Sequence, residues 1–123
     1  MAKKILVVED EEPIANAYSE LFRLEGYETV KATEPLRVYD AVKEHKPDLI
    51  LLDLMMNYLD GYDQVQLLKM DPETKHIPIV VITAKAPAQI DMQQFQALGV
   101  TEFFFKPPNI DKLTASVAAL IGK

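Results

Sequence analysis

Residues 48–53 read Asp48-Leu49-Ile50-Leu51-Leu52-Asp53, which places four consecutive aliphatic side chains between two carboxylates. A continuous apolar run of this length is typical of a strand that is buried on both faces of a parallel sheet, whereas a half-exposed strand alternates. We expect a strand over 48–52, with Asp53 at its carboxyl end. The chain contains four further short runs that favour strands, at 4–8, 29–31, 79–83 and 102–105.

The segments that follow these runs have the spacing of amphipathic helices. Gly26, the pair Asp71-Pro72 and Gly99 supply stop signals for three of them, and Asn109 or Asp111 supplies a start signal for the last. Strands that alternate with helices predict an α/β fold in which a parallel sheet is covered on both faces. The apolar positions of the five expected helices are Ile14, Ala17, Tyr18, Leu21, Phe22 and Leu24; Leu36, Val38, Tyr39, Ala41 and Val42; Val65, Leu67, Leu68 and Met70; Ile90, Met92, Phe95, Ala97 and Leu98; and Leu113, Val117, Leu120 and Ile121.

Composition excludes several classes of function. The 123 residues suit one compact domain. With 13 Lys and Arg against 19 Asp and Glu, the formal charge is −6, which disfavours direct binding to nucleic acid or anionic membrane. The chain has no Cys, which excludes disulfides, thiol chemistry and sulfur-ligated zinc. The first apolar run is too short for a signal peptide, and no segment is long enough to span a bilayer, so we expect a cytoplasmic protein.

Polar residues stand at the ends of four of the expected strands. Glu9 and Asp10 follow the first strand, Asp53 ends the third, Thr83 ends the fourth and Lys106 follows the fifth. Ligands of an open parallel sheet bind outside the carboxyl ends of its strands. We therefore expect these five side chains to converge on one edge of the sheet.

These residue types together indicate phosphoryl chemistry. Three neighbouring carboxylates repel one another unless a cation lies between them, and Mg²⁺ prefers one or two carboxylates completed by other oxygens. We expect Asp10 and Asp53 to bind Mg²⁺ directly and Glu9 to bind it directly or through water. Thr83 and Lys106 supply a hydroxyl and a cation that suit a phosphoryl group, and a carboxylate can itself be the nucleophile.

Four motifs make the sequence similar to a known family. They are Val7-Val8-Glu9-Asp10-Glu11, Leu51-Leu52-Asp53-Leu54-Met55-Met56, Val81-Ile82-Thr83-Ala84 and Phe105-Lys106-Pro107. In this order and at these spacings they resemble the receiver domains of two-component response regulators, in particular the chemotaxis type, over essentially the whole chain. The resemblance implies a doubly wound, flavodoxin-like (βα)5 fold with strand order 2-1-3-4-5. It also implies one receiver domain over 1–123 without an output domain.

The resemblance implies a role for each site residue. Asp53 is the expected phosphoacceptor, and the main-chain carbonyl of Met55 is expected to complete the Mg²⁺ site. Thr83 and the aromatic Phe103 are the expected switch residues, and Lys106–Pro107 is expected to be a cis peptide. The family acts as a signalling phosphoacceptor rather than as an enzyme with turnover, apart from self-catalysed transfer and slow autodephosphorylation.

Expected partners follow from the same resemblance. A sensor histidine kinase or a phosphotransfer protein would donate the phosphoryl group. A downstream protein, or a second copy of the chain, would bind the surface of the fourth helix, fifth strand and fifth helix. Two residues depart from the family's pattern: Asn57 replaces a common Pro after the acceptor, and Pro108 replaces a bulky apolar residue before the last helix.

Three alternatives remain beside this interpretation. A phosphatase of the haloacid-dehalogenase type needs a second Asp two residues after the nucleophile, where this chain has Met55. A flavodoxin-like electron carrier needs a phosphate-binding loop rich in Ser, Thr or Gly after the first strand, where this chain has four acidic residues at 9–12. A degenerate receiver would bind its partner without phosphorylation, although all five site residues are present.

Overall fold

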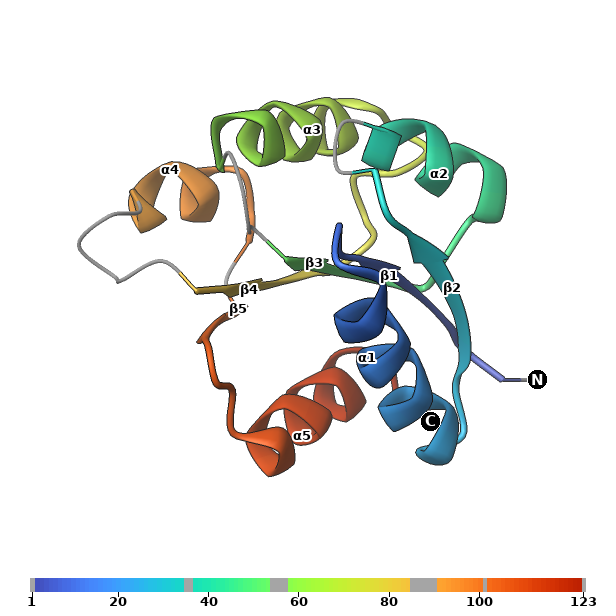
Figure 1. Cartoon of the computed structure of the whole chain (residues 1–123). Coiled ribbons are helices and arrows are strands. Elements are labelled where there is room, and N and C mark those ends of the chain that lie inside the picture. Colours follow the sequence, from blue (N-terminus) through green and yellow to red (C-terminus); the bar gives the residue numbers. More distant parts are fainter. Residues whose placement is uncertain (1, 35–36, 54–57, 85–90, 101, 123) are drawn as a thin grey trace.

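A computed structural model describes residues 2–34, 37–53, 58–84, 91–100 and 102–122, with the backbone alone for 58–61. Strands and helices alternate along the chain (Figure 1). The strands are β1 (Lys4–Val8), β2 (Glu28–Ala32), β3 (Leu49–Asp53), β4 (Ile79–Thr83) and β5 (Glu102–Phe105). The helices are α1 (Glu12–Leu24), α2 (Val38–His45), α3 (Tyr58–Met70), α4 (Met92–Ala97) and α5 (Ile110–Ile121).

The five strands form one parallel sheet in the order β2-β1-β3-β4-β5, as the family resemblance implies. Helices α1 and α5 cover one face, whereas α2, α3 and α4 cover the other (Figure 1). Crossovers between parallel strands are right-handed. The connection from β1 to β2 runs in one direction along the sheet and the connections from β2 to β5 run in the other, so their helices lie on opposite faces. Within the described ranges, no helix is long and apolar enough to cross a bilayer.

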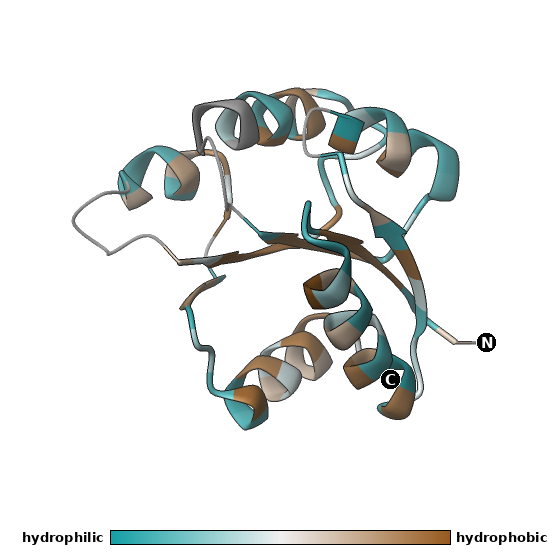
Figure 2. Ribbon diagram, in the orientation of Figure 1, coloured by the Kyte–Doolittle hydropathy of each residue, from teal (hydrophilic) through white to brown (hydrophobic). Residues whose placement is uncertain are grey.

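The alternating side chains of the central strands divide the core into two clusters. On β1, Leu6 and Val8 face the α2–α4 side, whereas Ile5 and Val7 face the α1–α5 side. Figure 2 shows the central strands as largely hydrophobic, between helices that mix hydrophilic and hydrophobic residues. The continuous apolar runs of the sequence therefore report burial on both faces, as expected.

The structure corrects two strand limits and the buried face of α1. β2 extends one residue further at each end than predicted, and β3 includes Asp53, whose backbone still pairs with Ile82. On α1 the buried residues are Ala15, Tyr18, Ser19 and Phe22, whereas Ala17 and Leu24 are exposed. A hydrophobic pattern misses Ser19 because its hydroxyl is polar, but this hydroxyl lies 2.5 Å from the Thr29 hydroxyl.

On two other helices, some of the apolar residues that were expected to face the core are exposed. On α3, Val65 and Leu68 are buried, but Leu67 and Met70 are largely exposed. On α5, Leu113 and Val117 are buried, whereas Leu120 is exposed. The helix ends agree with the sequence: Gly26 and Gly99 follow α1 and α4 with φ of +99° and +97°, and the Asn109 side chain caps α5 by accepting from the Lys112 N–H.

A polar cluster joins α2 to the turn between α3 and β4. Asp71 Oδ2 accepts hydrogen bonds from the Tyr39 hydroxyl at 2.6 Å and from Lys43 Nζ at 3.0 Å. Asp71 Oδ1 accepts from the Glu73 N–H at 2.9 Å. The Tyr39 hydroxyl, then the Glu73 N–H and then Lys43 lower the pKa of Asp71 to about 2. The Asp71 carboxylate is thus held ionised between two elements that are distant in sequence.

This cluster predicts a loss of stability in acid. The folded pKa of Asp71 lies below the unfolded value of about 4. The contribution of Asp71 to the free energy of unfolding is therefore complete above about pH 4, and it is lost as the pH falls through about 2. We expect the urea midpoint of the wild-type protein to fall more steeply over this window than that of Asp71→Asn. Equal slopes for the two proteins would contradict the role of Asp71, and Asp63→Asn on the exposed side of α3 is the matched control.

Candidate functional site

The strand register brings the predicted site residues to one edge of the sheet. Val8 pairs with Leu52, so the next residues, Glu9 and Asp53, lie side by side at the carboxyl ends of β1 and β3. Thr83 ends β4 and pairs with Phe105 of β5. Lys106 follows Phe105, and its N–H donates to the Thr83 carbonyl at 2.8 Å. Backbone pairing, rather than any local motif, thus collects these residues.

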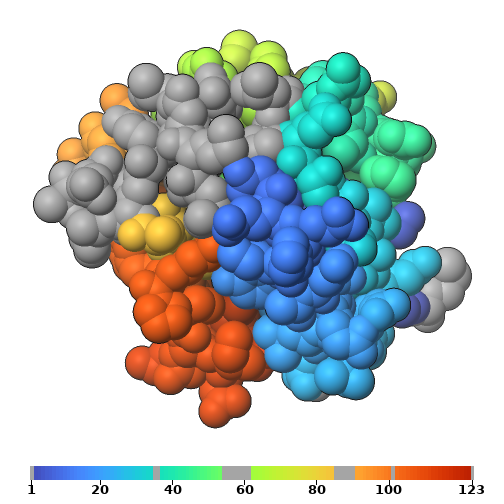
Figure 3. Space-filling model, viewed as in Figure 1, coloured from blue at the N-terminus to red at the C-terminus, as the bar shows by residue number. Residues whose placement is uncertain are grey.

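Lys106 makes the central contacts of the site. Its Nζ lies 2.5 Å from Asp53 Oδ2 and 3.4 Å from Glu9 Oε2. Glu9, Asp53 and Thr83 are buried, and the Lys106 side chain is only 16% exposed. Glu9 is oriented by the Glu11 N–H, which donates to Glu9 Oε1 at 3.1 Å. Figure 3 shows the start of α1 in blue beside the segment after β5 in orange, with the end of β4 in yellow next to them.

The site carries more negative than positive charge. Burial raises the pKa of Glu9, and the neighbouring Asp53 raises it further. Burial also raises the pKa of Asp10, and Glu9 adds to that rise. Burial lowers the pKa of Lys106, but Asp53 and Glu9 outweigh this effect, so that its pKa is raised overall. Among the described residues, the buried Glu9 and Asp53 thus share the Lys106 ammonium group, and the Asp10 carboxylate lies next to Glu9.

The donor set of the site fits Mg²⁺. Asp10 Oδ1 and Asp53 Oδ1 are buried and have no hydrogen-bond partner among the residues that the structure describes. Within these same ranges, no three Asp, Glu or His side chains form a complete metal cage. Mg²⁺ does not need one, because it typically takes one or two carboxylates and completes its shell with other oxygens. Met55, predicted to supply a carbonyl oxygen, lies outside the described residues, as does Asn57.

The remaining sequence predictions have mixed outcomes. The Lys106–Pro107 peptide is cis, as the resemblance implies. Pro108 does not disturb the entry to α5, which is capped by Asn109 in the ordinary way. Phe103 packs against the α2–α4 side of the core and not against the carboxylates. Its role as a switch stays a prediction.

Sequence reasoning overlooked one residue beside the site. The hydrophobic pattern predicts Tyr18 on the packing face of α1, and Tyr18 is buried there. Burial raises the pKa of the Tyr18 phenol, the nearby Lys106 cation opposes this rise, and Asp53 and Glu9 add to it. Tyr18 also lines a shallow hollow, with Ile14, Lys106, Pro107 and Pro108. The hydroxyl of a tyrosine on the buried face of α1 is the signal that could have indicated this, because a buried phenol usually finds a polar partner.

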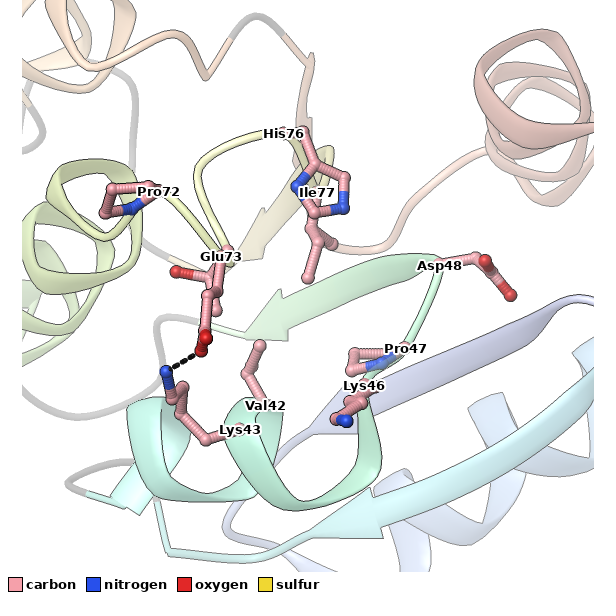
Figure 4. A pocket seen from close by; sticks show the side chains of 10 residues that line it. Val42, Lys43, Lys46, Pro47, Asp48, Pro72, Glu73, His76 and Ile77 are labelled. Carbon is pink, nitrogen blue, oxygen red and sulfur yellow. Dashed lines mark hydrogen bonds and ion pairs between the residues drawn. The ribbon is translucent and has the colours of Figure 1, made fainter.

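A second cavity, of about 460 Å³, lies at the opposite edge of the sheet (Figure 4). Its lining contains two lysines, Lys43 and Lys46, and two carboxylates, Asp48 and Glu73, so that their formal charges cancel. Lys43 is already paired with Glu73, as the dashed line shows, and with Asp71. This balance favours no particular ligand, so the carboxylate edge is the candidate functional site.

Comparisons with known proteins identify the family and the fold of this chain. Residues 5–118 match the family described as response regulator receiver domain. The polar-differentiation response regulator DivK of Brucella anthropi is 30% identical over 122 residues, which cover 99% of this chain and 98% of DivK. The chemotaxis protein CheY4 of Vibrio cholerae has a TM-score of 0.83 and 25% identity, and the match covers 98% of this chain and 99% of that one.

A further structure shares the fold. The receiver domain of the sensor histidine kinase PA1611 from Pseudomonas aeruginosa PAO1 has a TM-score of 0.84 and 24% identity, and the match covers 100% of both chains. That domain has a magnesium ion coordinated in its active-site cleft. Because the family match spans nearly the whole chain and DivK is related to it from end to end, this chain belongs to the response regulator receiver domains of two-component systems.

Proposed function

We propose that Asp53 accepts a phosphoryl group from a phospho-histidine on a sensor kinase or a phosphotransfer protein, with the help of Mg²⁺. The observation that carries this proposal is the ion pair between Lys106 and the buried Asp53. A carboxylate that is held in a water-poor site beside one ammonium group and two further carboxylates is prepared to meet a cation and an anionic phosphoryl group together.

The proposed transfer forms one bond to phosphorus and breaks another. An oxygen of Asp53 attacks phosphorus, the bond from phosphorus to the donor's imidazole nitrogen breaks, and the imidazole leaves with the electron pair. Lys106 then pairs with an oxygen of the transferred group, and the Thr83 hydroxyl donates to another. Both are held by the backbone bond that links Lys106 to Thr83. The protein therefore acts mainly by positioning and by charge stabilisation.

Mg²⁺ would be held by Asp10 and Asp53, with Glu9 directly or through water and the main-chain carbonyl of Met55. When bound, it neutralises charge on the phosphoryl oxygens. The buried Oδ1 atoms of Asp10 and Asp53 support this assignment, because an ionised oxygen without a partner is unfavourable in the interior.

Phosphorylation would be reported by Thr83 and Phe103 to the surface formed by α4, β5 and α5. We propose that a downstream protein, or a second copy of the chain, binds this surface with different affinities in the two states. Such a difference in affinity is what makes a phosphorylated domain a switch. The positions of Thr83 on β4 and Phe103 on β5 support this proposal, because the two strands are paired neighbours and α4 connects them.

Intact mass spectrometry after incubation with acetyl phosphate tests the proposed chemistry. We expect the mass to rise by one phosphoryl group in the presence of Mg²⁺ and to stay unchanged with a chelator. The small donor replaces the kinase, so the result depends on this chain alone. No gain, together with no binding of beryllofluoride by the folded protein, would show a degenerate receiver instead.

A further inference from the structure

Three aromatic rings form a continuous stack across the α3–α4 face of the sheet. The Phe95 ring of α4 meets the Tyr62 ring of α3 edge to face, with centroids 5.5 Å apart. On its other side it meets the Phe103 ring of β5, with centroids 6.0 Å apart and planes at 75°. Aromatic pairs in this geometry attract each other beyond the burial of their surface. The stack therefore ties α4 to one helix and to the predicted switch residue at once.

Helix α4 depends on this stack for its attachment. It spans only six residues, Met92–Ala97, and Phe95 is its one buried side chain. Phe95 is 0% exposed, whereas Met92 and Leu98 beside it are only partly buried. So short a helix is not stable by itself in water, which means that tertiary contacts hold it in place. The Tyr62 and Phe103 rings contact Phe95 directly, and we call these two rings the walls of the Phe95 socket.

One wall of the socket belongs to the same sheet face as Thr83. Phe103 pairs with Val81, and Thr83 lies two residues further along β4, so their side chains stand on the same side of the sheet. If the Phe103 ring rotates toward Thr83, its edge-to-face contact with Phe95 has to change. The contact between Tyr62 of α3 and Phe95 does not involve either strand.

We propose that Phe95 converts the rotation of Phe103 into the undocking of α4. This inference rests on the proposed function, because it takes Phe103 as the residue that responds to phosphorylation. Phe95 is the residue that responds to the movement of Phe103. Activation removes one wall of the Phe95 socket, and the backbone hydrogen bonds of α4 then open more often. The output surface would thus change by loosening a helix rather than by shifting it as a rigid body.

The test records two responses to beryllofluoride and Mg²⁺ in the same samples. The Thr83 amide resonance reports events at the phosphorylation site, and hydrogen exchange of the α4 amides reports docking. In the wild-type protein we expect the Thr83 resonance to shift and α4 exchange to become faster by about tenfold. In Phe95→Leu and in Tyr62→Leu we expect α4 to exchange fast already, so that the Thr83 shift remains but the change in α4 is lost.

Val42→Ala is the control, because Val42 is buried in the same cluster but lies on α2 outside the stack. It should keep both responses although it also destabilises the fold. If Phe95→Leu does not fold, Tyr62→Leu decides the question, since Tyr62 is only partly buried. Wild-type-like α4 responses in these variants, or slower α4 exchange on activation, would overturn the inference and leave the proposed function intact. An absent Thr83 shift in the wild-type protein would instead remove the proposed function.

Discussion

Asp53→Asn is expected to abolish the gain of a phosphoryl group completely, because an amide oxygen is not a competent nucleophile for phosphorus. The fold should survive the change. Loss of a carboxylate relieves its repulsion with Glu9, but it also leaves Lys106 with a weaker partner at 3.4 Å. Since these two effects oppose each other, we expect a net change of about 1 kcal/mol, which is a shift of about 4 °C in Tm.

Intact mass after treatment with acetyl phosphate and Mg²⁺ measures the first effect, and thermal unfolding measures the second. Asp63→Asn is the matched control, because it makes the same chemical change at an exposed position of α3. It should accept one phosphoryl group as the wild-type protein does. A phosphorylated and folded Asp53→Asn protein would move the acceptor to another residue and would contradict the proposal.

Lys106→Met is expected to be the most destabilising change at the site. Lys106 supplies the only cation within ion-pair distance of Asp53 and Glu9 among the described residues, and both carboxylates are buried. Removing one partner of a buried ion pair leaves uncompensated charge, and we expect a loss of about 3 kcal/mol in the free energy of unfolding. Met has a similar length and keeps the packing of the Lys106 stem, so the loss reports charge.

Addition of Mg²⁺ should restore part of this stability, because the metal replaces the missing positive charge between the carboxylates. Urea unfolding with and without Mg²⁺ measures both effects, and we expect the metal to stabilise Lys106→Met by more than it stabilises the wild-type protein. Lys112→Met, at an exposed position of α5, serves as the control and should be neutral. If Lys106→Met is as stable as Lys112→Met without metal, the ion pair does not hold the site together.

Local sequence patterns predicted the buried strands more accurately than the helix faces. A strand such as β4 lies between two layers, so each of its residues is buried and a continuous apolar run is sufficient to locate it. A helix touches the core along one stripe, and small shifts in its rotation decide which residues are covered. Ser19 is buried and Leu24 is exposed on α1 because packing against the sheet chose a stripe that hydrophobicity alone does not indicate.

The motifs indicated which residues form the site, and their positions at strand ends predicted that these would converge. Carboxylates and a lysine at the ends of parallel strands meet because strands in one sheet point the same way, so Glu9, Asp53 and Lys106 needed no structure to be grouped. The charges, and hence the expectation of Mg²⁺, followed from the residue types.

Only the tertiary structure revealed the contacts between side chains from distant segments. The Tyr62–Phe95–Phe103 stack joins a helix, a shorter helix and an edge strand, and each ring taken alone is an ordinary core residue. The position of Tyr18 beside Lys106 and the pairing of Asp71 with α2 have the same origin. The sequence by itself determined the sheet, its order through the family resemblance and the chemistry at its edge, because these depend on strand direction and residue type. The contacts between the three rings, and the attachment of α4 through them, depend on three-dimensional packing, because the residues involved are far apart in the chain and no local pattern relates them.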